Sequence, residues 1–187
     1  MQEKSSPHEM ITDFVTQKEV PNIGVEENRQ AVEKLLVESK GYTRGDIEVD
    51  ATIEFDMSDE RFRSDVDLVV SVNGKRFMVI KCAPGSLGSR HRETLAAARL
   101  LDDYQIPLCV VTDGKDADIL DSVTGDLIRQ GIEGIPSRQE AVRHMEDVRL
   151  EPYPENKVER ERIIFRSYDD MNVNVQRKLK NPKACSQ

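Results

Sequence analysis

Two aspartates in a strand-like segment are the residues whose types and spacing most directly indicate chemistry. Asp65 and Asp67 lie two apart in the stretch from Arg63 to Ala83. Residues two apart in a strand point to the same face, so we expect the two carboxylates to lie side by side. Carboxylates in such a strand are costly unless they are paired or bind a cation. They are therefore candidate metal ligands, and pairing with neighbouring basic residues explains them equally well.

The aspartates belong to a predicted β hairpin. Asn73-Gly74 is the dipeptide best suited to a two-residue turn, because both central residues take a positive φ. The second strand, Phe77 to Cys82, is almost continuously apolar, which is typical of a strand covered on both faces. Lys81 interrupts this run, and we expect it to face Asp67 across the hairpin.

The order of predicted elements indicates an α/β protein, with a mixed central sheet flanked by helices. We divide the chain into an N-terminal helical extension (1–20), an α/β domain (21–150), and a C-terminal helix with a flexible tail (151–187). The predicted helices are Pro7 to about Thr16, Val25–Ser39, Arg90–Tyr104, one from the Ser137 capping box to about Leu150, and Lys157–Met171. The predicted strands besides the hairpin are Ile47–Phe55, Pro107–Thr112 and Ala117–Leu120.

Charge is distributed unevenly along the chain. The net charge of −8 argues against a general nucleic-acid binder, because attraction to phosphate is the sequence-independent part of affinity. Between Arg61 and Arg99, however, eight cations and three acids give a net charge of +5. This basic strip is either a solvated face or a surface that contacts phosphate. The candidate nucleic-acid-binding residues are Arg63, Lys75, Arg76, Arg90, His91 and Arg92.

Several classes of protein are disfavoured by composition. No apolar run approaches the roughly 20 residues that a membrane span requires, so we expect no membrane association. The first ten residues contain no apolar segment typical of a secretory signal. Cys82 and Cys109 lie in apolar segments, so we expect them to be reduced, buried thiols of a cytoplasmic protein. The three scattered histidines form no readable metal cluster.

The order of elements and several short motifs resemble the PD-(D/E)xK nuclease fold. The similarity is greatest to the N-terminal domain of the R subunit of type I restriction enzymes and to its small stand-alone relatives, which are prokaryotic proteins. It covers about residues 10 to 130. The motifs that carry it are Glu26-Glu27-Asn28-Arg29-Gln30, Lys40-Gly41-Tyr42, Asp67-Leu68-Val69-Val70, Asn73-Gly74-Lys75, Val79-Ile80 and Val111-Thr112-Asp113-Gly114.

The resemblance implies a nuclease centre that this sequence has lost in part. In the family, a strand Asp and a Glu-x-Lys on the next strand, often with a helix Glu, hold Mg²⁺ and activate water. The strand Asp corresponds to Asp67, and the helix Glu to Glu26 or Glu27. The Glu of Glu-x-Lys falls on Lys81, and its Lys falls on Ala83.

Lys81 places an ammonium group where the family has a carboxylate. A cation there repels Mg²⁺ and pairs with Asp67. We therefore predict a degenerate centre with no cofactor. The helix residue that follows the hairpin, often Gln in the family, has no clear counterpart among Arg90, Arg92 and Glu93.

Three hypotheses follow for the function. The first is an inactive member of the nuclease fold that binds DNA or a protein partner through the basic strip. The second is an active Mg²⁺-dependent DNA endonuclease that uses Asp65 and Asp67 with Glu26 or Glu27, and Lys81 as the lysine. The third is a protein-interaction module without a nucleic-acid role, which could form a homodimer through the helix Lys157–Met171.

Overall fold

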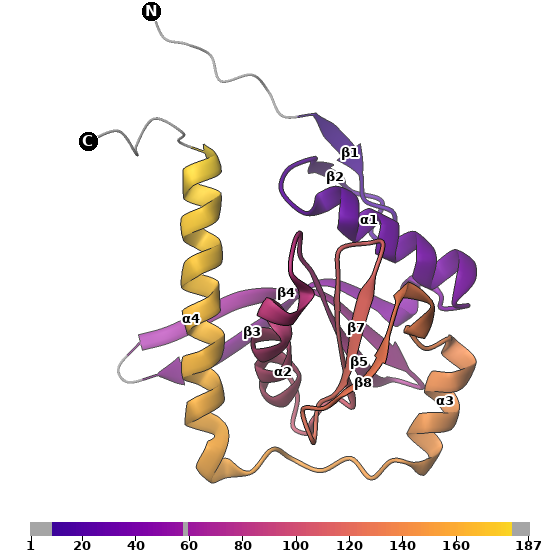
Figure 1. Cartoon of the computed structure of the whole chain (residues 1–187), viewed down its shortest axis with the longest axis vertical. Coiled ribbons are helices and arrows are strands. Elements are labelled where there is room, and N and C mark those ends of the chain that lie inside the picture. Colours follow the sequence, from indigo (N-terminus) through magenta and orange to yellow (C-terminus); the bar gives the residue numbers. More distant parts are fainter. Residues whose placement is uncertain (1–8, 58–59, 181–187) are drawn as a thin grey trace, which may run out of the picture.

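The computed structural model describes residues 9–57 and 60–180, with residues 170–180 described by their backbone alone. A six-stranded sheet in the order β3-β4-β5-β6-β7-β8 forms its centre (Figure 1). β5 and β6 run parallel, and the other neighbouring strands run antiparallel. The strands are β3 Ile47–Met57, β4 Glu60–Val72, β5 Lys75–Cys82, β6 Leu108–Thr112, β7 Ala117–Asp121 and β8 Leu127–Gln130.

Helices cover both faces of this sheet. One core cluster joins the sheet to α1 and α3, and a second joins the opposite face to α2 and α4. The chain passes from β5 through α2 into the parallel strand β6. The predicted mixed α/β sheet flanked by helices is therefore confirmed, and it is consistent with a restriction-endonuclease-like fold. The helices are α1 Glu26–Lys34, continued by a π-helical turn Leu35–Ser39, α2 His91–Leu100, α3 Arg138–Asp147 and α4 Glu155–Lys180.

The predicted hairpin is confirmed as β4 and β5. Asn73 and Gly74 take φ values of 53° and 74°, as the tight turn requires. Leu68 pairs with Ile80, and continuing this register places Asp67 opposite Lys81. The hairpin thus brings the two charged candidates to the same end of the sheet.

The predicted N-terminal helix is wrong over its described part. Residues 7 and 8 lie outside the described residues, and from Met10 the chain forms a small hairpin of β1 (Met10–Thr12) and β2 (Glu19–Pro21). The reason lies in α1, whose Gln30 and Glu33 side chains accept hydrogen bonds from the backbone of residues 14 and 15. These tertiary hydrogen bonds override the helix predicted from the local sequence. The predicted domain boundaries remain a prediction.

Two further differences concern the ends of the fold. The edge strand β8 was not predicted, because all its residues are exposed and show no alternation of apolar and polar side chains. Helix α4 continues to Lys180, so part of the predicted flexible tail is helical; residues 181–187 lie outside the described residues. The Ser137 capping box is present at the start of α3, as predicted.

Candidate functional site

Asp67 and Lys81 form an ion pair at the end of the β4–β5 hairpin. Lys81 Nζ lies 3.0 Å from Asp67 Oδ1, and the backbone N–H of Cys82 donates to Asp67 Oδ2 at 2.7 Å. Both side chains are largely buried, with exposed fractions of 16% for Asp67 and 19% for Lys81. The expected contact between them is present, and both oxygens of the carboxylate accept a hydrogen bond.

Glu93, in the first turn of α2, adds a second carboxylate to this pair. Its Oε1 atom lies 3.6 Å from Lys81 Nζ, and Arg90 Nη1 lies 3.1 Å from its Oε2 atom. Glu93 is buried, with 4% of its surface exposed. Sequence reasoning left it out of the catalytic candidates, and the signal that could have found it was an acid opening the helix that follows β5. We call Asp67, Lys81 and Glu93 the Lys81 centre.

The Lys81 centre holds its lysine in the charged form. Burial by itself lowers the pKa of the Lys81 ammonium, because a charge is poorly solvated away from water. The nearby Asp67 and Glu93 carboxylates outweigh this effect and raise the pKa above its ordinary value. At neutral pH a cation therefore stands beside two carboxylates.

Arg29 on α1 is the cation of a second cluster. Its Nη1 atom lies 2.7 Å from Asp50 Oδ1, and its Nη2 atom lies 2.8 Å from Glu26 Oε2 and 3.4 Å from Asp13 Oδ2. Gln30 Nε2 donates to Glu26 Oε1 at 2.7 Å. Burial opposes the charge of Arg29, but the carboxylates, Asp50 first, raise its pKa. As in the Lys81 centre, a basic side chain of the chain itself lies among the carboxylates and pairs with them.

Asp50 connects the two clusters. The pairs on either side of it in the β3–β4 ladder place it opposite Asp67. Burial raises the pKa of Asp50, Arg29 lowers it, and the charges of Asp67 and Asp65 raise it further, with a net increase. The strand pattern gave no signal for Asp50, because an acid there is expected on the exposed face of a half-buried strand.

The other acidic candidates are not assembled into one ligand set. Asp65 is exposed and accepts a hydrogen bond from Thr52 Oγ1 at 3.2 Å. Glu27 is exposed and accepts one from Asn22 Nδ2 at 3.3 Å. Glu26 belongs to the Arg29 cluster. The hairpin therefore unites Asp67 with Lys81, while Glu27 lies apart from them.

The Lys81 centre does not fit a divalent metal ion in this arrangement. Mg²⁺ requires oxygen ligands at about 2.1 Å in near-octahedral geometry. Asp67 Oδ1 instead faces an ammonium group, which repels a second cation in the same position, and Asp67 Oδ2 faces a backbone N–H. In the described part of the chain, no group of three or more His, Cys, Asp or Glu side chains is arranged to hold a metal ion.

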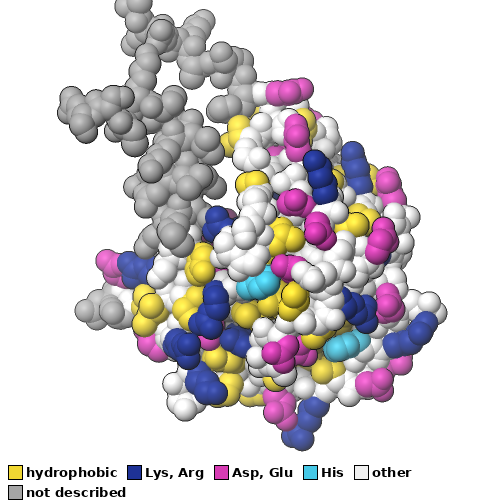
Figure 2. Space-filling view, viewed as in Figure 1, with side chains coloured by type: hydrophobic (Ala, Val, Ile, Leu, Met, Phe, Trp, Pro, Cys, Tyr) yellow, Lys and Arg dark blue, Asp and Glu magenta, His cyan; other side chains and the backbone are white. Residues whose placement is uncertain are grey.

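The six basic candidates do not form one continuous strip. Lys75 and Arg76 begin β5, whereas Arg90, His91 and Arg92 follow the loop after its end, about 25 Å along the strand. Acidic side chains lie among the basic ones on the face shown in Figure 2. Four candidates contact acids, in the pairs Arg63–Glu54 (3.5 Å), Arg76–Glu48 (2.9 Å), Arg90–Glu93 (3.1 Å) and His91–Asp118 (2.8 Å).

Glu33 on α1 is a fully buried acid beside the Arg29 cluster. The backbone N–H of Val15 donates to its Oε2 atom at 3.0 Å, while Oε1 has no hydrogen-bond partner. Burial, followed by the charge of Asp13, raises the pKa of Glu33 to about 7. Glu33 therefore attaches the β1–β2 hairpin to α1 and titrates near neutral pH.

We predict measurable coupling between Asp67 and Lys81. The variants Asp67→Asn and Lys81→Met should each lower the free energy of unfolding by about 1–3 kcal/mol, because each leaves a partly buried charge without its partner. The double variant should lose on the order of 1 kcal/mol less free energy of unfolding than the two single losses added together. Urea unfolding of the four proteins measures this coupling. The exposed pair Arg61–Glu54 serves as the control, for which we expect at most about 0.5 kcal/mol.

The Glu33 carboxyl predicts a pH-dependent stability. The unfolded chain ionises it near its ordinary pKa, but the folded protein keeps it protonated up to about pH 7. Relative to Glu33→Gln, the wild-type protein should therefore lose stability as the pH rises from about 4.5 to 7, by on the order of 3 kcal/mol. Urea unfolding across this pH range tests it, with the exposed Glu38→Gln as the control. A difference between wild type and Glu33→Gln that does not change with pH would contradict this prediction.

Comparison with known proteins identifies the family. No described helix is long and apolar enough to cross a membrane. Neither the curated proteins nor the solved structures contain a match to this chain. A family model described as the type I restriction enzyme R protein N terminus matches residues 25–136, which include α1, the β4–β5 hairpin and all three residues of the Lys81 centre. The chain therefore belongs to the family of the type I restriction enzyme R protein N terminus.

Proposed function

We propose that this chain is a member of its family that has lost metal-dependent cleavage and acts as a binding module. The observation that carries the proposal is the 3.0 Å contact between Lys81 Nζ and Asp67 Oδ1. An ammonium group there supplies the positive charge that Mg²⁺ would otherwise bring. With Ala83 at the position of the family's lysine, neither half of the Glu-x-Lys motif remains.

A protein partner agrees better with the surface than DNA does. The chain carries a net charge of −8, and the basic candidates are separated and mostly paired with acids. Acids beside these cations reduce their attraction for phosphate. Fluorescence anisotropy with duplex DNA at low and physiological salt distinguishes the two kinds of partner: tight binding that weakens steeply with salt would favour DNA.

A second candidate function is an endonuclease with a rearranged centre. Glu93 favours it, because this buried carboxylate lies 3.6 Å from Lys81 Nζ. Asp67, Glu93 and Lys81 together contain the two carboxylates and one lysine of the family's centre, in shifted positions. For cleavage, Lys81 would have to leave Asp67 so that both carboxylates could take a metal ion.

Restoring the carboxylate tests the proposed loss of the metal site. In Lys81→Glu, the cation that repels Mg²⁺ is replaced by a ligand beside Asp67 and Glu93. We expect about 10 mM Mg²⁺ to raise the melting temperature of this variant by about 4 °C. Lys75→Glu introduces the same charge at the exposed start of β5 and is the matched control. The melting temperatures of the control and of the wild-type protein should not respond to Mg²⁺.

A plasmid-nicking assay with the wild-type protein separates the two candidate functions. The proposed binding module leaves supercoiled DNA intact in Mg²⁺ or Mn²⁺. Metal-dependent nicking that disappears in both Asp67→Asn and Glu93→Gln would overturn the proposal in favour of the rearranged endonuclease.

A further inference from the structure

Helix α4 lies over the Lys81 centre although it is outside the part of the chain that matches the family. The match ends at residue 136, and α4 begins at Glu155. Phe165 of α4 packs edge-on against Phe55 and Phe62, with ring centroids 6.4 and 6.2 Å apart. Figure 1 shows α4 crossing the long β3–β4 hairpin beside α2. A segment outside the matched residues therefore covers one face of the domain.

Phe165 also closes a small recess that contains two residues of the Lys81 centre. The recess measures about 10 Å³, room for about one water molecule. Asp65, Lys81, Glu93 and Ala97 lie in its wall, and Phe165 is the contribution of α4. We call this space the Lys81 recess. While α4 is in place, a molecule larger than water is too big for it.

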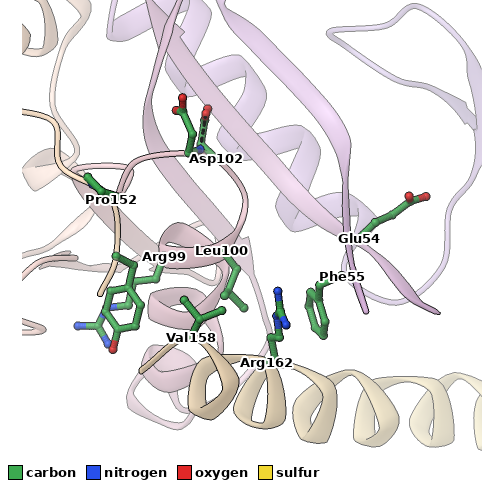
Figure 3. Close-up of a pocket in the computed structure, with 10 residues that line it drawn as sticks. Glu54, Phe55, Arg99, Leu100, Asp102, Pro152, Val158 and Arg162 are labelled. Carbon is green, nitrogen blue, oxygen red and sulfur yellow. Dashed lines mark hydrogen bonds between the residues drawn. The ribbon is translucent and has the colours of Figure 1, made fainter. Parts of the chain in front are cut away.

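The contact between α4 and the domain leaves an open groove beside it. This groove, of about 200 Å³, lies between α4, the end of α2 and β3 (Figure 3). Leu100, Val158, Arg162 and Phe55 lie around this space in the close-up. Two buried atoms of α4, Glu161 Oε2 and Arg162 Nε, have no hydrogen-bond partner. Unpaired buried polar groups weaken the attachment of a helix.

The polar contacts that hold α4 are partly exposed, and they include a 3.2 Å hydrogen bond from Arg162 Nη1 to the carbonyl oxygen of Asp56. Glu161 lies 3.3 Å from Arg99, and Arg166 lies 3.4 Å from the exposed Glu60. Ser64 and Asp169 form a further hydrogen bond. Water can replace the exposed contacts when the helix leaves. The irregular segment 148–154, which contains Pro152 and Pro154, joins α3 to α4 and can act as the hinge.

We propose that α4 is a displaceable cap over the Lys81 recess. Displacement of α4 removes Phe165 and opens Lys81 and Glu93 more fully to solvent, while the sheet, α1 and α2 stay folded. Access to the Lys81 recess is then controlled by a segment outside the matched residues. The inference does not depend on the proposed loss of metal binding, because the cap governs access to the recess whatever the recess binds.

Thiol labelling in the full chain tests the cap. Ala97→Cys places a thiol in the recess beneath α4, and Ala141→Cys places one at an equally buried position of α3 on the opposite face of the sheet. Labelling with a small maleimide is followed by peptide mass spectrometry, which separates these thiols from Cys82, Cys109 and Cys185. We expect Ala97→Cys to react at least about tenfold faster, because opening of a weakly attached segment requires less free energy than global unfolding.

Adding Phe165→Ala to each cysteine variant completes the test. It should accelerate labelling at position 97 by a further factor of about ten or more, and labelling at position 141, which requires global unfolding, by no more than the same factor, so that position 97 remains the faster one. Hydrogen exchange of the wild-type protein gives an independent readout, with faster exchange in α4 than in α2 and β5. Equal labelling rates at both positions, or equal protection of α4 and α2, would show that α4 leaves only on global unfolding and would overturn the proposal.

Discussion

The placement of a lysine ammonium between two acidic side chains is the constraint around which this structure is organised. Lys81 lies 3.0 Å from Asp67 and 3.6 Å from Glu93, so it compensates carboxylates that would otherwise repel one another in a partly buried site. The Arg29 cluster repeats this solution one strand away with Glu26, Asp50 and Asp13. In both clusters a basic side chain of the protein supplies the positive charge that a metal cation could bring.

Under the proposed loss of the metal site, this internal compensation would let the family fold persist. β4, β5 and α2 still converge at the same end of the sheet, because the hairpin turn and the β5–α2–β6 crossover fix their positions. The proposed replacement of a carboxylate by Lys81 would change the chemistry at that end, above packing that is apolar. On the outside, α4 adds a layer over Lys81 and Glu93, and the proposed cap and the proposed loss of cleavage concern the same few residues.

Much of this architecture could be predicted from local sequence signals. The Asn73-Gly74 turn, the apolar run of β5 and the Ser137 capping box each specify their element by short-range physics, and the contact between Asp67 and Lys81 follows from the hairpin register. Glu93 and Asp50 could not be assigned in this way, because their roles arise when α2 and β3 dock beside the hairpin. The N-terminal helix was wrong for a related reason: Gln30 and Glu33 of α1 bind the backbone that a local signal assigned to a helix.

Calorimetric titration of Mn²⁺ and Mg²⁺ into the wild-type protein, with Asp67→Ala as the reference, tests the central claim most directly. If the Lys81 ammonium occupies the place of the metal, neither protein gives a heat of binding beyond that of dilution. Binding at millimolar affinity or tighter in the wild-type protein, lost in Asp67→Ala, would contradict the account. Lys81 would then be a residue that moves aside for a metal ion.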